Sequence, residues 1–426
     1  MRRVELTIPE ARKPAVKRVL DGTGVGYTAS GPLDGPNDVQ LVTVTFSAPV
    51  NAVEPILDRL WDFGLADDTA SVTVTPVESV VSSRVEELRT RFSRSSESGT
   101  RIARAELLAR ARDLTPGLYA YLVLLILSVV IAVAGLVANS AAVVVGSMVV
   151  APLMGPALAA SVGTTLGDRG LFERGVVMQV VGVVVAICVA TGFAIVVRWI
   201  HLLPADGVLT VAEISSRVAP DLLALVVAIA AGAAGAYSLS SGTSTALVGV
   251  AVAAALIPPL GVVGIGIAWG MPMVALGAFV LVAVNLVAIN LVAVFVFNVL
   301  GYRPGRTGNE EAVRSTVRRR LSVLLVSLLV LSSFLGVVTI GEIRASTMEE
   351  DVRADVEGVL ASPEYADVEV VAIQFIGDDS LPVSQPERVE VIVGHPPDQS
   401  HPGLATDLRA AVDPSIVVDL SFEQQE

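Results

Sequence analysis

The chain consists of long uncharged apolar blocks separated by short polar segments, and both of its ends show shorter alternating patterns. Each block holds about 20 residues or more, the length that a helix needs to cross a bilayer. Hydrophobic residues make up 53% of the chain and charged residues 17%, as is typical of a polytopic α-helical membrane protein. We predict seven spanning helices, with approximate limits Leu118–Val137, Ala141–Gly163, Val176–Val197, Pro220–Ser238, Thr243–Ala268, Met271–Leu300 and Leu321–Ile340.

Residues 1–80 read as a small soluble α/β domain. We expect a short strand near Val25, three longer strands at Val4–Ile8, Val39–Phe46 and Ser71–Val77, and helices at Glu10–Leu20 and Val53–Phe63. This βα(β)βαβ order predicts a ferredoxin-like or ACT-like fold. The glycines of Gly22–Gly26 follow a helix instead of a strand, so we interpret them as a turn and not as a nucleotide loop.

Residues 342–426 read as a second small α/β domain of the same kind, with the order αββαβ. The expected helices are Met348–Leu360 and Gly403–Val412, and the expected strands are Val368–Phe375, Val389–Val393 and Ile416–Leu420. This tail contains 19 Asp/Glu and 4 Arg, a balance of −15, so a total of −13 leaves the rest of the chain at +2. Such a distribution argues against nucleic-acid binding.

Arginines outside the apolar blocks predict the orientation. Residues 81–116 form an Arg-rich amphipathic linker, Arg169 and Arg174 follow the second helix, and residues 301–320 form a basic loop. By the positive-inside rule, all three segments are cytoplasmic. We therefore expect an inner-membrane protein with a cytoplasmic N-terminus, a seventh helix over 321–341 and an extracytoplasmic C-terminus.

Two of the apolar blocks are interrupted near their middle. Pro152, Gly155 and Pro156 interrupt the second, and Pro258 and Pro259 interrupt the fifth. Proline in a helix removes a backbone donor and clashes with the preceding turn, so both helices should break there. At an offset of 103 residues the two halves share this design, which gives a membrane core over 117–300 with repeats 118–198 and 220–300. Because three helices are an odd number, the repeats are predicted to be inverted, as in many secondary transporters.

Uncharged polar residues accompany the breaks. Between Tyr119 and Leu166, and between Leu222 and Tyr302, the chain has no charged residue and no histidine, which disfavours proton coupling through a mid-membrane carboxylate. Broken helices can bind ions or polar solutes through hydroxyls, amides and freed carbonyls. Each such side chain taken alone is more typical of hydrogen bonding between helices. The candidate substrate- or ion-binding residues are Asn139, Ser140, Ser147, Pro152, Gly155, Pro156, Ser241, Thr243, Thr245, Pro258, Pro259 and Asn285.

Catalytic and metal-binding patterns are weak in this sequence. The apolar blocks contain no histidine, no H-E-x-x-H and no paired aspartates, so we expect neither an enzyme nor a cofactor. His395 and His401, with Asp398 between them, lie in a Pro-rich segment without a third well-placed ligand, which favours an ordinary loop over a metal site.

The motif PLMGP at Pro152–Pro156, the D-R-G-L-F-E-R-G loop that follows it and the L-I-P-P-L helix resemble a bacterial and archaeal membrane family. It is the three-hundred-and-eighty-ninth domain of unknown function, described as an uncharacterised hydrophobic domain. The resemblance covers about residues 115–300 and implies a multi-pass inner-membrane protein. It implies no substrate and no catalytic residue. Only the family's signature carries over, namely Pro152, Leu153, Met154, Gly155 and Pro156.

Two functions fit these patterns. The first is a transporter or permease for a small polar solute or ion, in which the broken helices 2 and 5 meet at mid-membrane. The alternative is a non-transporting sensor or scaffold, whose soluble domains bind ligands or partners on the two faces of the membrane. In both cases the lipid bilayer is the main partner, and we expect a homo-oligomer.

Overall fold

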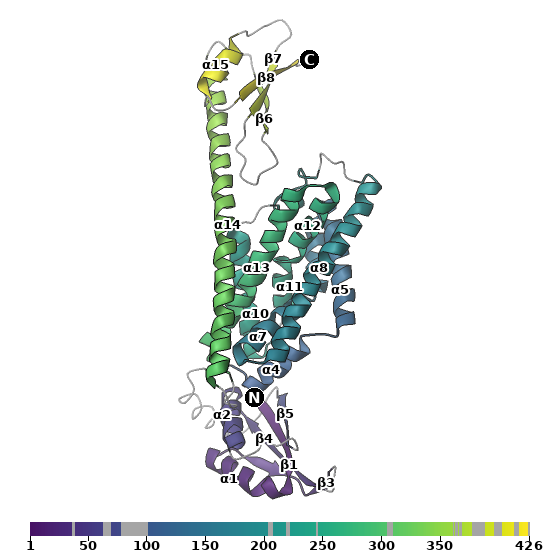
Figure 1. The fold of residues 1–426 in the computed structure, drawn as a ribbon, viewed down its shortest axis with the longest axis vertical. Helices are drawn as coiled ribbons and strands as arrows, with labels where there is room; N and C mark the ends of the chain where they lie inside the picture. Colours follow the sequence, from purple (N-terminus) through teal and green to yellow (C-terminus); the bar gives the residue numbers. More distant parts are fainter. Residues whose placement is uncertain are drawn as a thin grey trace.

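The computed structural model describes residues 1–35, 39–62, 70–77, 101–202, 208–218, 222–243, 246–304, 310–360, 362, 365, 369–376, 388–395, 403–412 and 417–424. A bundle of helices lies between two small β-sheets (Figure 1). Within these residues five helices are long and apolar enough to cross a membrane, and α6 (Ala141–Val150) with α7 (Met154–Leu166) makes a sixth span if this bent pair counts as one. The prediction of a polytopic α-helical membrane protein agrees with this finding.

The N-terminal domain, residues 1–77, is an antiparallel sheet covered by two helices. Its strand order is β2-β4-β1-β5, and β3 also pairs with β4. Alternation along β1 puts Val4, Leu6 and Ile8 in the domain core, where residues of α1 and α2 pack against them. The elements are β1 (Arg2–Pro9), η1 (Glu10–Arg12), α1 (Lys13–Thr23), β2 (Tyr27–Ala29), β3 (Leu33–Asp34), β4 (Gln40–Ala48), α2 (Val50–Leu60) and β5 (Ser71–Pro76).

The helical bundle has one end next to the N-terminal domain. There the backbone N–H of Ile102 donates to Ser240 O at 2.7 Å, and the hydroxyl of Tyr302 donates to Ile102 O at 2.8 Å. These bonds hold the C-terminal ends of α10 and α13 against the segment that leaves the domain. Besides α6 and α7, the bundle contains α5 (Leu118–Val137), α8 (Arg169–Trp199), α9 (Ala212–Ser215), α10 (Leu222–Ser241), α11 (Ala246–Ala254), α12 (Ile257–Trp269) and α13 (Pro272–Val299).

The helix α4 (Arg104–Asp113) connects the N-terminal domain to the bundle. Its Arg112 pairs with Asp168 at 2.9 Å, and Asp168 also caps α8 by accepting the N–H of Leu171 at 2.9 Å. Burial acts to raise the pKa of Asp168, but these two donors outweigh it and hold that pKa below its usual value. The linker predicted over 81–116 therefore includes a helix that is fixed to the start of α8.

Both predicted helix breaks are present, and Pro152 lies within the first of them. The first break is the segment Ala151–Leu153, across which α6 and α7 are bent by 50°, and Pro156 lies in the first turn of α7. The second is a turn at Ala255 and Leu256, after which Pro258 and Pro259 occupy the first turn of α12. Proline fits a first turn because the N–H groups there have no intrahelical acceptor. Pro156, Pro258 and Pro259 thus lie in the first turn of the second half of each helix, and α11 with α12 still counts as one 24-residue span.

The last helix, α14 (Glu310–Leu360), is a single helix of 51 residues that runs beside the bundle and continues to the C-terminal sheet (Figure 1). It contains both the segment 321–341 and the helix expected at Met348–Leu360. It is not among the spans given above, so the seventh crossing stays a prediction. The sheet has the order β6-β7-β8, antiparallel and then parallel, and consists of β6 (Glu369–Ile376), β7 (Arg388–His395) and β8 (Val417–Gln424), with α15 (Leu404–Ala411) against it.

Small residues let the bundle helices approach closely. At the crossing of α12 and α8, a β-carbon on Gly264 would lie 2.6 Å from the carbonyl carbon of Ala190 and from the backbone nitrogen of Thr191. In membranes such close contact between backbones supplies much of the attraction between helices. Gly192, the residue after Thr191 in α8, faces open space.

We predict that Gly264→Ala destabilises the protein by about 1–3 kcal/mol, because the methyl group must push α12 away from α8. Gly192→Ala, on the open face of α8, is the matched control and should unfold at the temperature of the wild type. Thermal unfolding of the two purified variants in the same detergent measures this difference. Equal unfolding temperatures for both variants would show that the two helices do not touch at Gly264.

Candidate functional site

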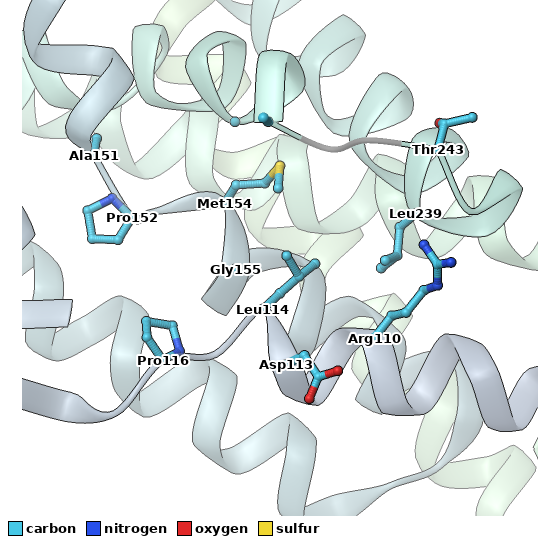
Figure 2. Close-up of a pocket in the computed structure, with 12 residues that line it drawn as sticks. Arg110, Asp113, Leu114, Pro116, Ala151, Pro152, Met154, Gly155, Leu239 and Thr243 are labelled. Atoms are coloured by element: carbon cyan, nitrogen blue, oxygen red, sulfur yellow. The ribbon is translucent and has the colours of Figure 1, made fainter. Parts of the chain in front are cut away.

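A cavity of about 550 Å³ lies at the first helix break and is open on one side. Its walls come from the end of α4, the segment Ala151–Leu153, the start of α7 and the junction of α10 with α11 (Figure 2). It therefore joins the broken second helix to the beginning of the fifth. The lining residues are Arg110, Asp113, Leu114, Pro116, Ala151, Pro152, Met154, Gly155, Leu239, Thr243, Ala246 and Gly249.

The cavity offers polar groups from backbone and side chains. The break separates the last carbonyls of α6 from the first N–H groups of α7. The hydroxyl of Ser128 donates to Ser147 O in the last turn of α6 at 2.7 Å, and no side chain caps the start of α7. Such helix ends carry partial charges of opposite sign. Arg110, Asp113 and Thr243 add one cation, one anion and one hydroxyl at the wall. This combination suits a small polar solute, while Leu114, Met154 and Leu239 provide apolar contact.

Glu106 forms an ion pair with Arg110, which lines the cavity. Arg110 and Arg2 bind the same carboxylate oxygen, Glu106 Oε1, at 3.0 and 2.9 Å. The Nε of Arg2 also donates to Glu106 Oε2 at 3.0 Å. The side chains of Arg2 and Glu106 are each 9% exposed, so this pair is shielded from water. The N-terminal domain is thereby connected to the cavity wall through one carboxylate.

Gly155 allows the cavity wall to close on the α4 side. A β-carbon at this position would overlap the carbonyl oxygen of Leu114. The wall segment Leu114–Pro116 thus lies directly on the first turn of α7, and only glycine leaves room for it.

The structure brings some of the predicted site residues together. Pro152, Gly155 and Thr243 line the cavity, and the hydroxyl of Ser241 lies 3.0 Å from that of Thr243. Pro156 is buried next to the cavity in α7.

Other predicted site residues lie elsewhere. Asn139 and Ser140 form the turn between α5 and α6, where Asn139 accepts the N–H of Glu213 in α9. Ser147 is buried and donates to Val144 O within α6. Pro258 and Pro259 are buried in α12, and Thr245 lies outside the described residues. The structure therefore does not place Asn139, Ser140, Ser147, Pro258 or Pro259 in the cavity lining, and a binding role for these positions and for Thr245 stays a prediction.

Two side-chain amides bind carbonyls close to the breaks. Gln179 of α8 donates to Pro156 O at 3.2 Å, and Asn285 of α13 donates to Ala255 O at 2.9 Å. A buried carbonyl without a partner is costly in lipid, so the bond from Asn285 stabilises the second break. Pro156 O lies inside α7, and the bond from Gln179 fixes the first turn of α7 to α8. Within the described residues the Asn285 Oδ1 atom is buried and has no hydrogen-bond partner.

Arg110, Asp113 and Leu114 were not among the predicted site residues. They belong to the Arg-rich linker, and the spacing of Glu106 and Arg110 is that of an ordinary ion pair on a solvated helix. Their position at the cavity depends on a long-range approach between α4 and α7, which no local pattern indicates. Among the described residues there is no group of three or more His, Cys, Asp or Glu side chains arranged to hold a metal, and His401 and Asp398 lie outside those residues.

The fold and the cavity define a polytopic α-helical membrane protein with an interrupted helix at its centre. Residues 148–291 match the family described as a domain of unknown function (DUF389), which confirms the resemblance predicted from the sequence. An uncharacterized protein of Methanocaldococcus jannaschii is 31% identical over 220 residues, which cover 51% of this chain and 66% of the relative. The chain thus spans just under two thirds of that relative's length. No solved structure matches the chain.

We predict that a cysteine in the cavity reacts with a water-soluble thiol reagent. Gly249 faces Met154 at ordinary van der Waals distance, so Gly249→Cys should fit, and replacing the single native cysteine by Cys188→Ala removes the background. In the same background, Ser147→Cys is the control, because Ser147 is fully buried outside the cavity. Mass spectrometry of the folded protein should show labelling of the first variant and, only after denaturation, of the second. An unreactive Gly249→Cys in folded protein would mean that water does not enter the cavity.

Proposed function

We propose that this protein is a non-enzymatic permease of the inner membrane, and that its cavity admits a small polar solute or ion between helices 2 and 5. The observation that carries this proposal is the open cavity of about 550 Å³ at the break between α6 and α7. Lipid tolerates a helix break only where protein or water covers the freed backbone groups. A water-filled cavity at such a break is where many secondary transporters bind their cargo.

The arrangement of the breaks supports two inverted repeats. In the proposed repeats, α5, α6–α7 and α8 correspond to α10, α11–α12 and α13. In each repeat an amide of the third helix, Gln179 or Asn285, bonds to a carbonyl near the break of the second. The first repeat begins at the end of the bundle where the helix α10 of the second repeat ends, as the bond from Ile102 to Ser240 indicates. Opposite entry into the membrane is what inversion requires.

The N-terminal domain is proposed to be cytoplasmic and regulatory. Its strand order β2-β4-β1-β5, with two helices on one face, supports the ferredoxin-like interpretation. The shared Glu106 between Arg2 of this domain and Arg110 of the cavity gives it a direct contact with the proposed entrance. The C-terminal domain is then extracytoplasmic, and the protein is expected to form a homo-oligomer.

The alternative function is a membrane sensor or scaffold without transport. The observation that favours it is α14, which joins the cytoplasmic end of the bundle to the C-terminal sheet as one continuous helix. In that case the cavity is a ligand site that passes nothing across the membrane.

If the protein is a permease, we expect solutes to enter vesicles that contain it faster than protein-free vesicles. Stopped-flow light scattering should follow the entry of three test solutes, namely sodium chloride, glycerol and alanine, into proteoliposomes. We expect at least one of them to enter about tenfold faster than into protein-free vesicles. Gly249→Trp should abolish this increase because the indole fills the cavity.

Gly192→Trp is the matched control, since Gly192 faces open space on α8 and the added ring remains outside the bundle. It should transport like the wild type. Transport through this cavity would be contradicted if all three solutes entered no faster than into protein-free vesicles. It would also be contradicted if the Gly249→Trp variant kept the wild-type entry rate. Binding of a solute without entry would support the sensor.

A further inference from the structure

A second cavity, of about 490 Å³, forms a groove between α14 and the bundle helices α7, α8 and α13. Its walls are mainly apolar, and two of the wall residues, Val180 and Val323, are each 58% exposed. Val180 belongs to the span α8, where an exposed valine faces lipid, and with α14 as the proposed seventh crossing the groove opens sideways into the membrane. This groove has no lining residue in common with the cavity at the helix break.

Two cations stand at one end of the groove. Arg319 and Arg320 belong to the beginning of α14, and both line it. The guanidinium of Arg320 lies 3.7 Å from the centre of the Phe172 ring, in the first turns of α8. The nearby acid Glu173 is already paired with Arg169 at 2.6 Å, and among the described residues neither Arg319 nor Arg320 forms an ion pair. The positive charge at this end is therefore available to an anion.

The polar groups deeper in the groove have no free donors. Asn290 donates to Gln179 Oε1 and to Leu286 O, both at 2.8 Å. Gln179 donates to Pro156 O and Gly175 O. The hydroxyls of Ser161 and Thr164 donate within α7. An anion or polar solute at this depth would find no donor, whereas an apolar chain can pass along these satisfied groups without loss.

We infer that this groove binds one anionic phospholipid of the surrounding membrane, with its phosphate at Arg319 and Arg320 and one acyl chain between α13 and α14. The residues Val294 to Leu286 of α13 give the groove a length of about 12 Å along the helix. A cationic end and an apolar interior complement an amphiphile of opposite charge, and basic pockets between membrane helices commonly bind such headgroups. The lipid would fix α14 to the bundle whether or not the first cavity transports a solute.

Purified full-length protein in a neutral detergent tests this inference. Its thermal unfolding is measured with added phosphatidylglycerol, phosphatidylcholine, or free glycerol phosphate, and native mass spectrometry counts the lipid that stays bound. We expect phosphatidylglycerol alone to raise the unfolding temperature, with one molecule retained per chain. The double variant Arg319→Gln/Arg320→Gln should retain about tenfold less of it.

Two further variants separate the groove from general charge effects. Arg318→Gln removes the same charge from an exposed neighbour that does not line the groove, so it should bind the lipid like the wild type. Val287→Phe keeps both arginines but narrows the chain-binding part, and it should weaken retention. The proposed lipid site would be overturned if both lipids raised the unfolding temperature equally, or if glycerol phosphate alone gave the full increase. It would also be overturned if Arg318→Gln lost as much bound lipid as the double variant, or if Val287→Phe retained as much as the wild type.

Discussion

A helix interrupted inside a membrane exposes backbone N–H and C=O groups that lipid cannot bind, and the bundle is arranged around this constraint. Gln179 and Asn285 bind the carbonyls of Pro156 and Ala255, one next to each break. Ser128 binds Ser147 O in the last turn of α6, and the break residues Ala151 and Pro152 line the open cavity with the start of α7. The breaks are thus stable only because neighbouring helices and a polar space cover them. The same groups that need covering are the ones that can bind a polar solute.

The sequence predicted the elements well where local rules decide. The length of the apolar blocks predicted the spanning helices. The alternation of apolar and polar residues in Val4–Ile8 predicted a strand with one buried face. The first break lies at Pro152, as predicted, whereas the second lies just before the prolines that predicted it, because Pro258 and Pro259 favour a first helical turn as strongly as they disfavour a helix interior.

The set of residues that line the cavity depends on long-range contacts, which local sequence patterns do not predict. Pro152, Gly155 and Thr243 were expected at a site and line one cavity, yet Arg110 and Asp113 reach the same cavity from a segment that reads as a surface linker. Asn139 was expected near the break because it is close to it along the chain. It adopts a positive φ of 49° in the turn after α5 and contacts α9 instead. The ten residues of α6 lie between Asn139 and the cavity, and this helix is about 15 Å long.

The length of α14 has a mechanical consequence. As one helix of 51 residues it is about 75 Å long, well over twice the apolar thickness of a bilayer. Its first turns hold Arg320 against Phe172, and its last turns contribute Val352 and Val356 to the core of the C-terminal domain. A tilt of this helix by about five degrees would displace its C-terminal end by about 6 Å. A small change in the tilt of α14 beside the bundle would therefore move the C-terminal domain by about the length of a side chain.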